Sequence, residues 1–129
     1  MTTLPGILAL YGLFTILTIF AQASAAQGQV GLPALLRPRD DLKLQGVAAR
    51  LERAQLNAIV AMALFAPAVL ILIQKGVATP GTLLAAQVFL IARVLYVPLY
   101  AFGIAGLRTL VWTVGILATA WLYIVGLMA

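Results

Sequence analysis

The chain has 129 residues, of which 64% are hydrophobic and 9% are charged, and its formal net charge at pH 7 is +5. With a mean hydropathy of +1.13 it has too few polar side chains to cover a soluble globule, so the composition excludes that class. Cysteine and histidine are absent and the acidic residues all lie between Asp40 and Glu52, which excludes disulfides and thiol nucleophiles and leaves little for a metal site. We therefore predict an all-α membrane protein, with residues 1–129 as a single domain and no metal site.

The first predicted span covers residues 4–26 and carries no charge. Its end, Ala21 to Ala26, imitates the small-residue cleavage site of a secretory signal peptide, which is the alternative interpretation. A signal peptide normally opens with Lys or Arg, whereas the first basic residue here is Arg37. We therefore interpret this segment as a retained transmembrane helix.

Helix-breaking residues follow the first span. Gly28, Gly31, Pro33 and Pro38 interrupt helical continuity, and the polar run 37–43 carries most of the charge outside the membrane. We expect a loop here, from about residue 27 to residue 43.

Three more hydrophobic segments complete a four-helix bundle, and we predict them at residues 46–75, 80–103 and 107–127. Gly76 suits the end of the second span, and Thr79 and Pro80 suit the cap and first residue of the third, which predicts a tight hairpin. Pro67 and Pro98 lie inside spans, where each removes an amide donor and is expected to bend its helix. Such a small bundle leaves few helix faces for a cavity within one subunit, so we expect an oligomer with any sizeable site between subunits.

The basic residues are distributed unequally between the two sides of the membrane. Four spans place both termini on one side and the first and third connections on the other. Lys75 is the one cation expected on the side of the termini, and the other side receives Arg37, Arg39, Lys43, Arg50, Arg53 and Arg108. By the positive-inside rule, the long first loop faces the cytoplasm and both termini lie on the opposite side. We do not expect nucleic-acid binding, because the cations lie at helix ends and form no exposed stripe with aromatic side chains.

Polar residues gather on one face of the second span. At about 100° per residue, Arg50, Arg53 and Asn57 fall within some 60° of one another. This stripe descends from the cytoplasmic mouth of the span. The alternative is that Arg50, Arg53 and Arg108 only extend to anionic lipid headgroups, which needs no ligand.

A second polar stripe is predicted on the third span, where Arg93, Tyr96 and Tyr100 share a face, and Arg108 opens the fourth span at the same level. Arg93 lies about 20 Å along the helix from Pro80 and cannot easily reach either membrane surface. Its alternative role is that of a buried structural arginine bonded to carbonyls or a tyrosine. The tyrosines have an alternative role as packing aromatics.

This collection of side chains suits a particular ligand chemistry. Guanidinium groups with phenol and amide donors favour a small anion that carries carboxylates, because bidentate charged hydrogen bonds replace the water that the anion sheds. An adjacent arginine would also stabilise the thiolate of a bound thiol, whose ordinary pKa is about 8.5. An enzyme of this kind needs no nucleophile of its own.

Two motifs resemble the membrane-associated proteins in eicosanoid and glutathione metabolism, the MAPEG family. The first is the run Arg-Ala-Gln-Leu-Asn at residues 53–57, which is similar to the cysteinyl-leukotriene synthase branch. The second is Ala-Arg-Val-Leu-Tyr-Val-Pro-Leu-Tyr at residues 92–100, with Arg108 soon after. The resemblance covers nearly the whole chain, which overall looks more like the uncharacterised bacterial members. It implies a four-helix homotrimer in a bacterial inner membrane, with glutathione bound between subunits as co-substrate.

Carried over by position, the resemblance implies roles for five residues. Arg53 and Asn57 would hold the tripeptide's backbone or carboxylates, and Tyr96 and Tyr100 would contact it from the third helix. Arg108 would be the catalytic residue that stabilises the glutathione thiolate.

Other positions carry weaker implications or depart from the family pattern. Arg93 matches a structural arginine and Gln55 a weaker contact. Val60 stands where many members carry a glutamate that meets the glutathione amino group, and Ala61 replaces an aromatic or polar neighbour. A buried ammonium left without an acceptor costs about 1–3 kcal/mol. Val60 therefore bears directly on how glutathione would bind.

Two classes of function follow. The first is a glutathione transferase or peroxidase that acts on a lipophilic small-molecule substrate entering from the lipid bilayer. The alternative is a non-catalytic lipid-binding or scaffold protein of the same fold, which Val60 and the lack of acidic residues deep in the spans favour. A small transporter or channel is a third possibility, to which the uniformly apolar first span gives little support.

Overall fold

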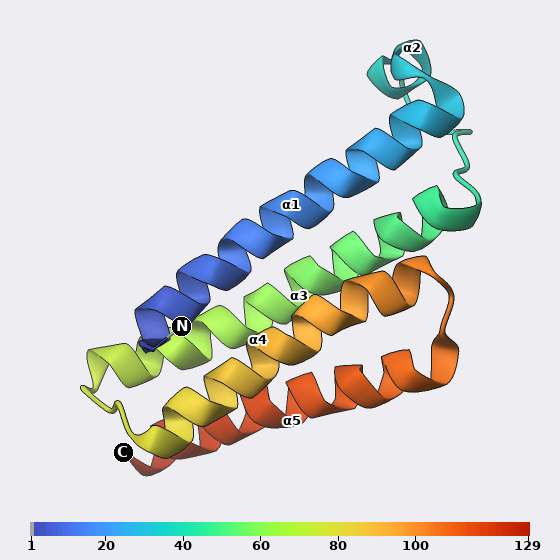
Figure 1. Cartoon of the computed structure of the whole chain (residues 1–129). Helices are drawn as coiled ribbons and strands as arrows, with labels where there is room; N and C mark the ends of the chain where they lie inside the picture. Colours follow the sequence, from blue (N-terminus) through green and yellow to red (C-terminus); the bar gives the residue numbers. More distant parts are fainter. Residues whose placement is uncertain (1) are drawn as a thin grey trace.

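The computed structural model describes residues 2–129 and shows four long helices and one short one (Figure 1). These are α1 (Leu4–Val30), α2 (Leu32–Leu36), α3 (Gly46–Gln74), α4 (Pro80–Ala101) and α5 (Ala105–Met128). The four long helices are each long and apolar enough to cross a membrane. The predicted all-α, four-span architecture is therefore confirmed.

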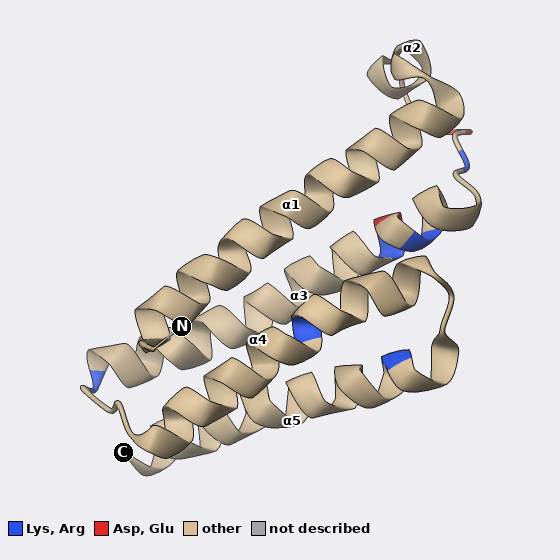
Figure 2. Ribbon diagram, viewed as in Figure 1, with Lys and Arg blue, Asp and Glu red and all other residues tan. Residues whose placement is uncertain are grey.

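Both ends of the chain lie at the same end of the bundle, as an even number of spans requires (Figure 1). α2 and the connections from α1 to α3 and from α4 to α5 lie at the other end. Figure 2 shows most of the basic residues toward that second end. Lys75 caps the carboxyl end of α3, at the end of the bundle where the termini lie. The unequal distribution of charge predicted from the sequence therefore holds along the bundle axis.

The first helix is longer than predicted. α1 continues through Gly28 to Val30, and Gly31 then ends it with φ +83°, a conformation that favours glycine. The prediction that the chain leaves the helix near residue 27 is wrong, because one glycine inside an apolar helix costs only about 1 kcal/mol. Pro33, expected to break the helix, instead occupies the first turn of α2, where a proline is tolerated.

The connection between α4 and α5 lies two residues earlier than predicted, at residues 102–104 in place of 104–106. α4 ends at Ala101, and Gly103, with φ +73°, allows the Ile104 amide to donate to the Leu99 carbonyl at 2.9 Å. This glycine-based cap ends the helix two residues earlier than expected. Pro67 and Pro98 both lie within continuous helices, so neither ends its span.

An aromatic group from three helices fills the centre of the bundle. The rings of Phe65 and Phe89 stack with centroids 3.8 Å apart, and Tyr11 meets Phe89 edge-on at 4.9 Å. The Tyr11 hydroxyl donates to the Ala58 carbonyl at 2.8 Å. Close packing and such interhelical hydrogen bonds stabilise a bundle in lipid, where the hydrophobic effect gives little drive between helices.

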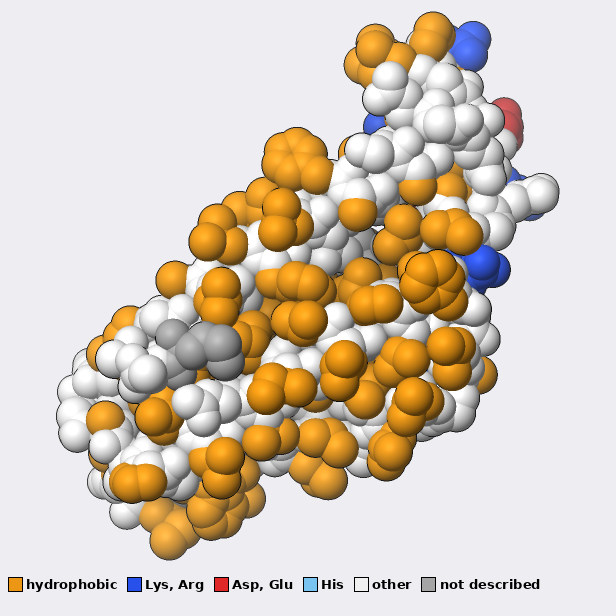
Figure 3. Space-filling view, viewed as in Figure 1, with side chains coloured by type: hydrophobic (Ala, Val, Ile, Leu, Met, Phe, Trp, Pro, Cys, Tyr) orange, Lys and Arg blue, Asp and Glu red, His pale blue; other side chains and the backbone are white. Residues whose placement is uncertain are grey.

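Small residues let α5 approach its neighbours. A Cβ placed on Gly115 would contact Ala92 and Arg93 at 3.7 Å, and one on Gly126 would stand 3.1 Å from Ile71. Hydrophobic side chains cover much of the outer face of the bundle (Figure 3). This surface suits contact with lipid or with other subunits.

Candidate functional site

Tyr100 brings two arginines from different helices together at the cytoplasmic end predicted for the bundle. Arg53 on α3 donates from Nε to the Tyr100 hydroxyl at 3.1 Å. The Arg108 guanidinium, from the first turns of α5, lies over the Tyr100 ring with its Cζ 4.3 Å from the ring centroid. Three helices thus contribute to one group, which we call the Tyr100 cluster (Arg53, Tyr100 and Arg108). Of the guanidinium groups predicted to meet, the structure brings Arg53 and Arg108 together at Tyr100.

Tyr96 lies one turn deeper on α4 and is buried. Its ring meets that of Tyr100 edge-on with centroids 5.6 Å apart, and the Cζ of Arg93 lies 4.3 Å from its centroid. Tyr96 therefore separates the Tyr100 cluster from Arg93 and contacts both. Its ring packs in the way that the alternative interpretation describes.

Arg50 has a role that neither sequence interpretation anticipated. Its Nε donates to the carbonyl of Ala101, the last residue of α4, at 2.8 Å. A cation at this position satisfies a free carbonyl and complements the negative end of the helix dipole. Arg50 thus ties the start of α3 to the end of α4 and fixes the backbone beside Tyr100.

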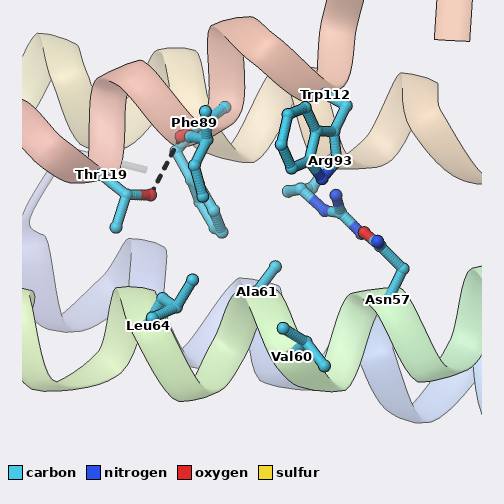
Figure 4. A pocket seen from close by; sticks show the side chains of 10 residues that line it. Asn57, Val60, Ala61, Leu64, Phe89, Arg93, Trp112 and Thr119 are labelled. Carbon is cyan, nitrogen blue, oxygen red and sulfur yellow. Dashed lines mark hydrogen bonds between the residues drawn. The ribbon is translucent and has the colours of Figure 1, made fainter. Parts of the chain in front are cut away.

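A cavity of about 110 Å³ lies beside Arg93, between α3, α4 and α5. Figure 4 shows Asn57 and Arg93 pointing toward one another at one end of it, next to Trp112. The other lining residues are largely apolar: Val60, Ala61, Leu64, Phe89, Gly115, Ile116 and Thr119. We call this space the Arg93 cavity.

Several polar atoms around the Arg93 cavity have no hydrogen-bond partner among the described residues. They are the Nε and Nη2 atoms of Arg93, which is only 2% exposed, and the Oδ1 atom of Asn57. The Oε1 atom of Gln55 on α3 also lacks a partner, but Gln55 does not line this cavity. Buried polar groups are nearly always satisfied in native proteins, so these atoms mark a place where further donors and acceptors are expected.

The sequence alone did not indicate every residue of the site. Trp112 follows Arg108 by one helical turn on α5, and that spacing was an available signal for it. Gly115 lines the cavity because its missing side chain leaves the space open beside Ala92 and Arg93, which no local pattern indicates. Ala61 and Val60, noted as departures from the family pattern, both line the cavity.

A family model described as the MAPEG family matches residues 2–128. The chain belongs to the MAPEG family. The comparisons with curated proteins and with solved structures found no match. The family match extends over all four membrane-spanning helices, so the resemblance carried by the Arg53 and Arg93 motifs is confirmed at the level of the family. Members of this family include glutathione-dependent transferases and peroxidases as well as proteins with other roles.

Proposed function

We propose that this MAPEG protein is an integral membrane glutathione-dependent transferase or peroxidase that acts on a lipophilic electrophile. The observation that carries the proposal is the Tyr100 cluster, in which the guanidinium groups of Arg53 and Arg108 flank one tyrosine. None of the three side chains of the cluster is acidic, so the positive charge of its two arginines is not balanced within the cluster. Such a cluster suits an anionic thiol compound with carboxylate groups.

Each residue of the cluster has a separate task. Arg53 binds a carboxylate or backbone carbonyl of glutathione, and the Tyr100 hydroxyl keeps the Arg53 side chain oriented toward the site. Arg108 lies next to the sulfur and favours its thiolate form through its positive charge. In a transferase the thiol proton passes to solvent and the thiolate sulfur forms a bond to the electrophilic carbon of the lipophilic substrate. The leaving group departs with the electron pair of the bond that breaks, or, in an addition, the electron pair of the attacked double bond moves to its far atom. Arg108 stays protonated throughout and acts by its charge.

The same arrangement favours an assembly in which subunits complete the site. The Tyr100 cluster and the mouth of the Arg93 cavity open toward the outside of the single chain, where Val60 is 58% exposed. A homotrimer would cover this face with a neighbouring subunit and exclude water from the thiolate. We place the cluster on the cytoplasmic side of a bacterial inner membrane, because the basic residues gather at this end of the bundle.

The thiolate provides a direct test. Purified protein mixed with glutathione at pH 7 should develop the ultraviolet absorbance band of a thiolate, although the free thiol, with its ordinary pKa of about 8.5, is mostly protonated at that pH. Arg108→Gln should abolish the band, and Arg108→Lys should retain part of it. Arg37→Gln, on the loop, is the matched control and should leave the band unchanged. Binding of glutathione without any thiolate band in the unaltered protein would refute the role of Arg108.

A non-catalytic lipid-binding role is the second candidate. It is favoured by a groove of about 470 Å³ between α1 and α4, which is lined entirely by apolar side chains, among them Leu13, Leu17 and Ile91. Native mass spectrometry of the protein in mild detergent distinguishes the two candidates. A retained lipid on a protein that neither binds glutathione nor forms a thiolate would favour the second.

A further inference from the structure

The connection between α4 and α5 and the first turn of α5 form an exposed apolar surface. From Ala101 to Leu107 the chain has no charged or polar side chain, whereas the connections from α1 to α3 and from α3 to α4 each contain a lysine. Phe102 is 75% exposed, Ile104 46% and Leu107 50%, and we call these three residues the α4–α5 tip. Figure 3 shows hydrophobic side chains next to basic ones at this end of the bundle. Exposed apolar groups of this kind mark a contact with lipid or protein.

The backbone of the connection is already hydrogen-bonded within the chain. The amides of residues 102, 103 and 104 donate to carbonyls in the last turn of α4 at 2.9–3.0 Å. The carbonyl of Ala101 accepts a hydrogen bond from Arg50 Nε at 2.8 Å. A connection whose amides are satisfied internally can lie against lipid, where an unpaired amide is costly.

The lengths of the helices place this connection at the edge of the hydrocarbon. α4 has 22 residues, which at ~1.5 Å per residue span about 33 Å, close to the ~30 Å thickness of the hydrocarbon core of a bilayer. α3 has 29 residues and spans about 44 Å. Figure 1 shows α1 and α3 extending past the α4–α5 connection. With the start of α4 at one boundary of the hydrocarbon, the α4–α5 tip lies at the other.

The start of α5 limits how deep the tip can lie. Among the described residues, no side chain caps the first amides of α5. These N–H groups need water or lipid headgroups, because hydrocarbon offers them no acceptor. The tip therefore fits the boundary between acyl chains and headgroups, where the apolar face of an interfacial segment is buried.

A basic side chain borders the tip. Arg50 bonds to Ala101 directly before the tip, and a Cβ placed on Gly103 would stand 3.9 Å from Arg50 Nε. The Arg50 side chain is partly exposed. Lipid phosphates lie at the level of the headgroups, so a cation beside an inserted apolar group suits a leaflet that carries anionic lipids.

We propose that the α4–α5 tip inserts into the bilayer leaflet at this end of the bundle, and that Arg50 binds the phosphate of an anionic phospholipid beside it. The partner of the tip is the surface of the membrane that holds the protein. The inserted tip fixes the depth of the Tyr100 cluster, because Tyr100 precedes Phe102 by two residues. This inference needs no glutathione and is independent of the proposed function.

Spin labels measure the depth of the tip. The chain has no cysteine, so one introduced cysteine carries one nitroxide label. Phe102→Cys and Leu107→Cys replace exposed side chains, and Asp41→Cys, on the long loop, is the control in water. In vesicles of phosphatidylcholine and phosphatidylglycerol, oxygen concentrates in lipid and a nickel chelate stays in water. The ratio of oxygen to nickel accessibility at positions 102 and 107 should exceed that at position 41 and match that of a phospholipid spin-labelled near its headgroup.

Two results overturn the proposal. A ratio at positions 102 and 107 equal to that at position 41 places the tip in water. Labels at both positions that neither reagent reaches show that another protein chain, a second copy or a different protein, covers the tip. Both substituted side chains lie outside the packed core, and circular dichroism of each labelled variant checks that the helices are retained.

Lipid retention tests the charge beside the tip. Native mass spectrometry of protein released from vesicles with equal amounts of the two lipids should show more retained phosphatidylglycerol than phosphatidylcholine. Arg50→Gln should lower that ratio by about fivefold, which corresponds to ~1 kcal/mol for one cation near an anionic surface. Arg50→Lys keeps the charge and should keep the ratio. An unchanged ratio in Arg50→Gln overturns the assignment of an anionic phospholipid to Arg50.

Discussion

The substitution Val60→Glu tests whether Arg93 lacks a partner. Val60 and Arg93 line one cavity, and the two free N–H groups of Arg93 are available to a carboxylate placed there. A glutamate at position 60 should form an ion pair with Arg93 across the cavity. We therefore expect a more stable protein, although a charge is being added within the membrane-spanning part of α3.

The magnitude follows from the number of hydrogen bonds gained. Two charge-assisted bonds contribute about 1.5 kcal/mol each, and ordering the glutamate side chain costs about 1–2 kcal/mol, so the net gain is about 1–2 kcal/mol. Without Arg93 the same glutamate has no cation to pair with and should cost roughly 2–3 kcal/mol at this depth. The effect of Val60→Glu should therefore change sign between the normal and Arg93→Gln backgrounds.

Equilibrium unfolding in mixed micelles, followed by circular dichroism, measures this double-mutant cycle. The four proteins are the unaltered chain, each single variant and the combination, with Val60→Gln as the uncharged control of similar size. Should Val60→Glu destabilise both backgrounds equally, Arg93 would either have another partner or lie out of reach, and the account of the cavity would be wrong.

Three further substitutions test the packing that positions the site. Gly126→Val should destabilise the protein by about 1–3 kcal/mol, because even a Cβ at this position stands 3.1 Å from Ile71. Gly106→Ala is the control and should be neutral or slightly stabilising, because the space around Gly106 is open. If thermal unfolding shows the reverse order, the close approach of α3 and α5 is contradicted. Tyr11→Phe removes the buried hydrogen bond to the Ala58 carbonyl and should lower the free energy of unfolding by about 1 kcal/mol. The same micelle titration measures this loss. If the free energy of unfolding does not change, the bond contributes nothing to the stability of the bundle.

The helices could be predicted from the sequence because lipid restricts the backbone conformations that a membrane-spanning segment can adopt. A segment that crosses the membrane must satisfy its own backbone hydrogen bonds, so a long apolar run is a helix, and four such runs were found where predicted. The boundaries were less accurate where a glycine decides the end. Gly28 continues its helix while Gly31 and Gly103 end theirs, and only the backbone conformation distinguishes these cases.

The candidate site could be predicted in part, because its residues lie on helices whose periodicity is known. Helical periodicity placed Arg53 with Asn57 and Arg93 with Tyr100 on shared faces, since residues three, four or seven apart lie on one side of a helix. It did not show that Arg50 would bond to the end of α4, that Tyr96 would be buried against Arg93, or that Gly115 would leave a cavity beside that arginine. These contacts join residues far apart in the chain.

The sequence by itself determined the membrane-spanning helices, the family and the faces that carry polar groups, because each depends on composition or on short-range spacing. Only the tertiary structure decided which guanidinium atoms have partners and which remain free, because that depends on how α3, α4 and α5 pack. The two unpaired N–H groups of Arg93 result from this packing, and no spacing within a single helix contains that information.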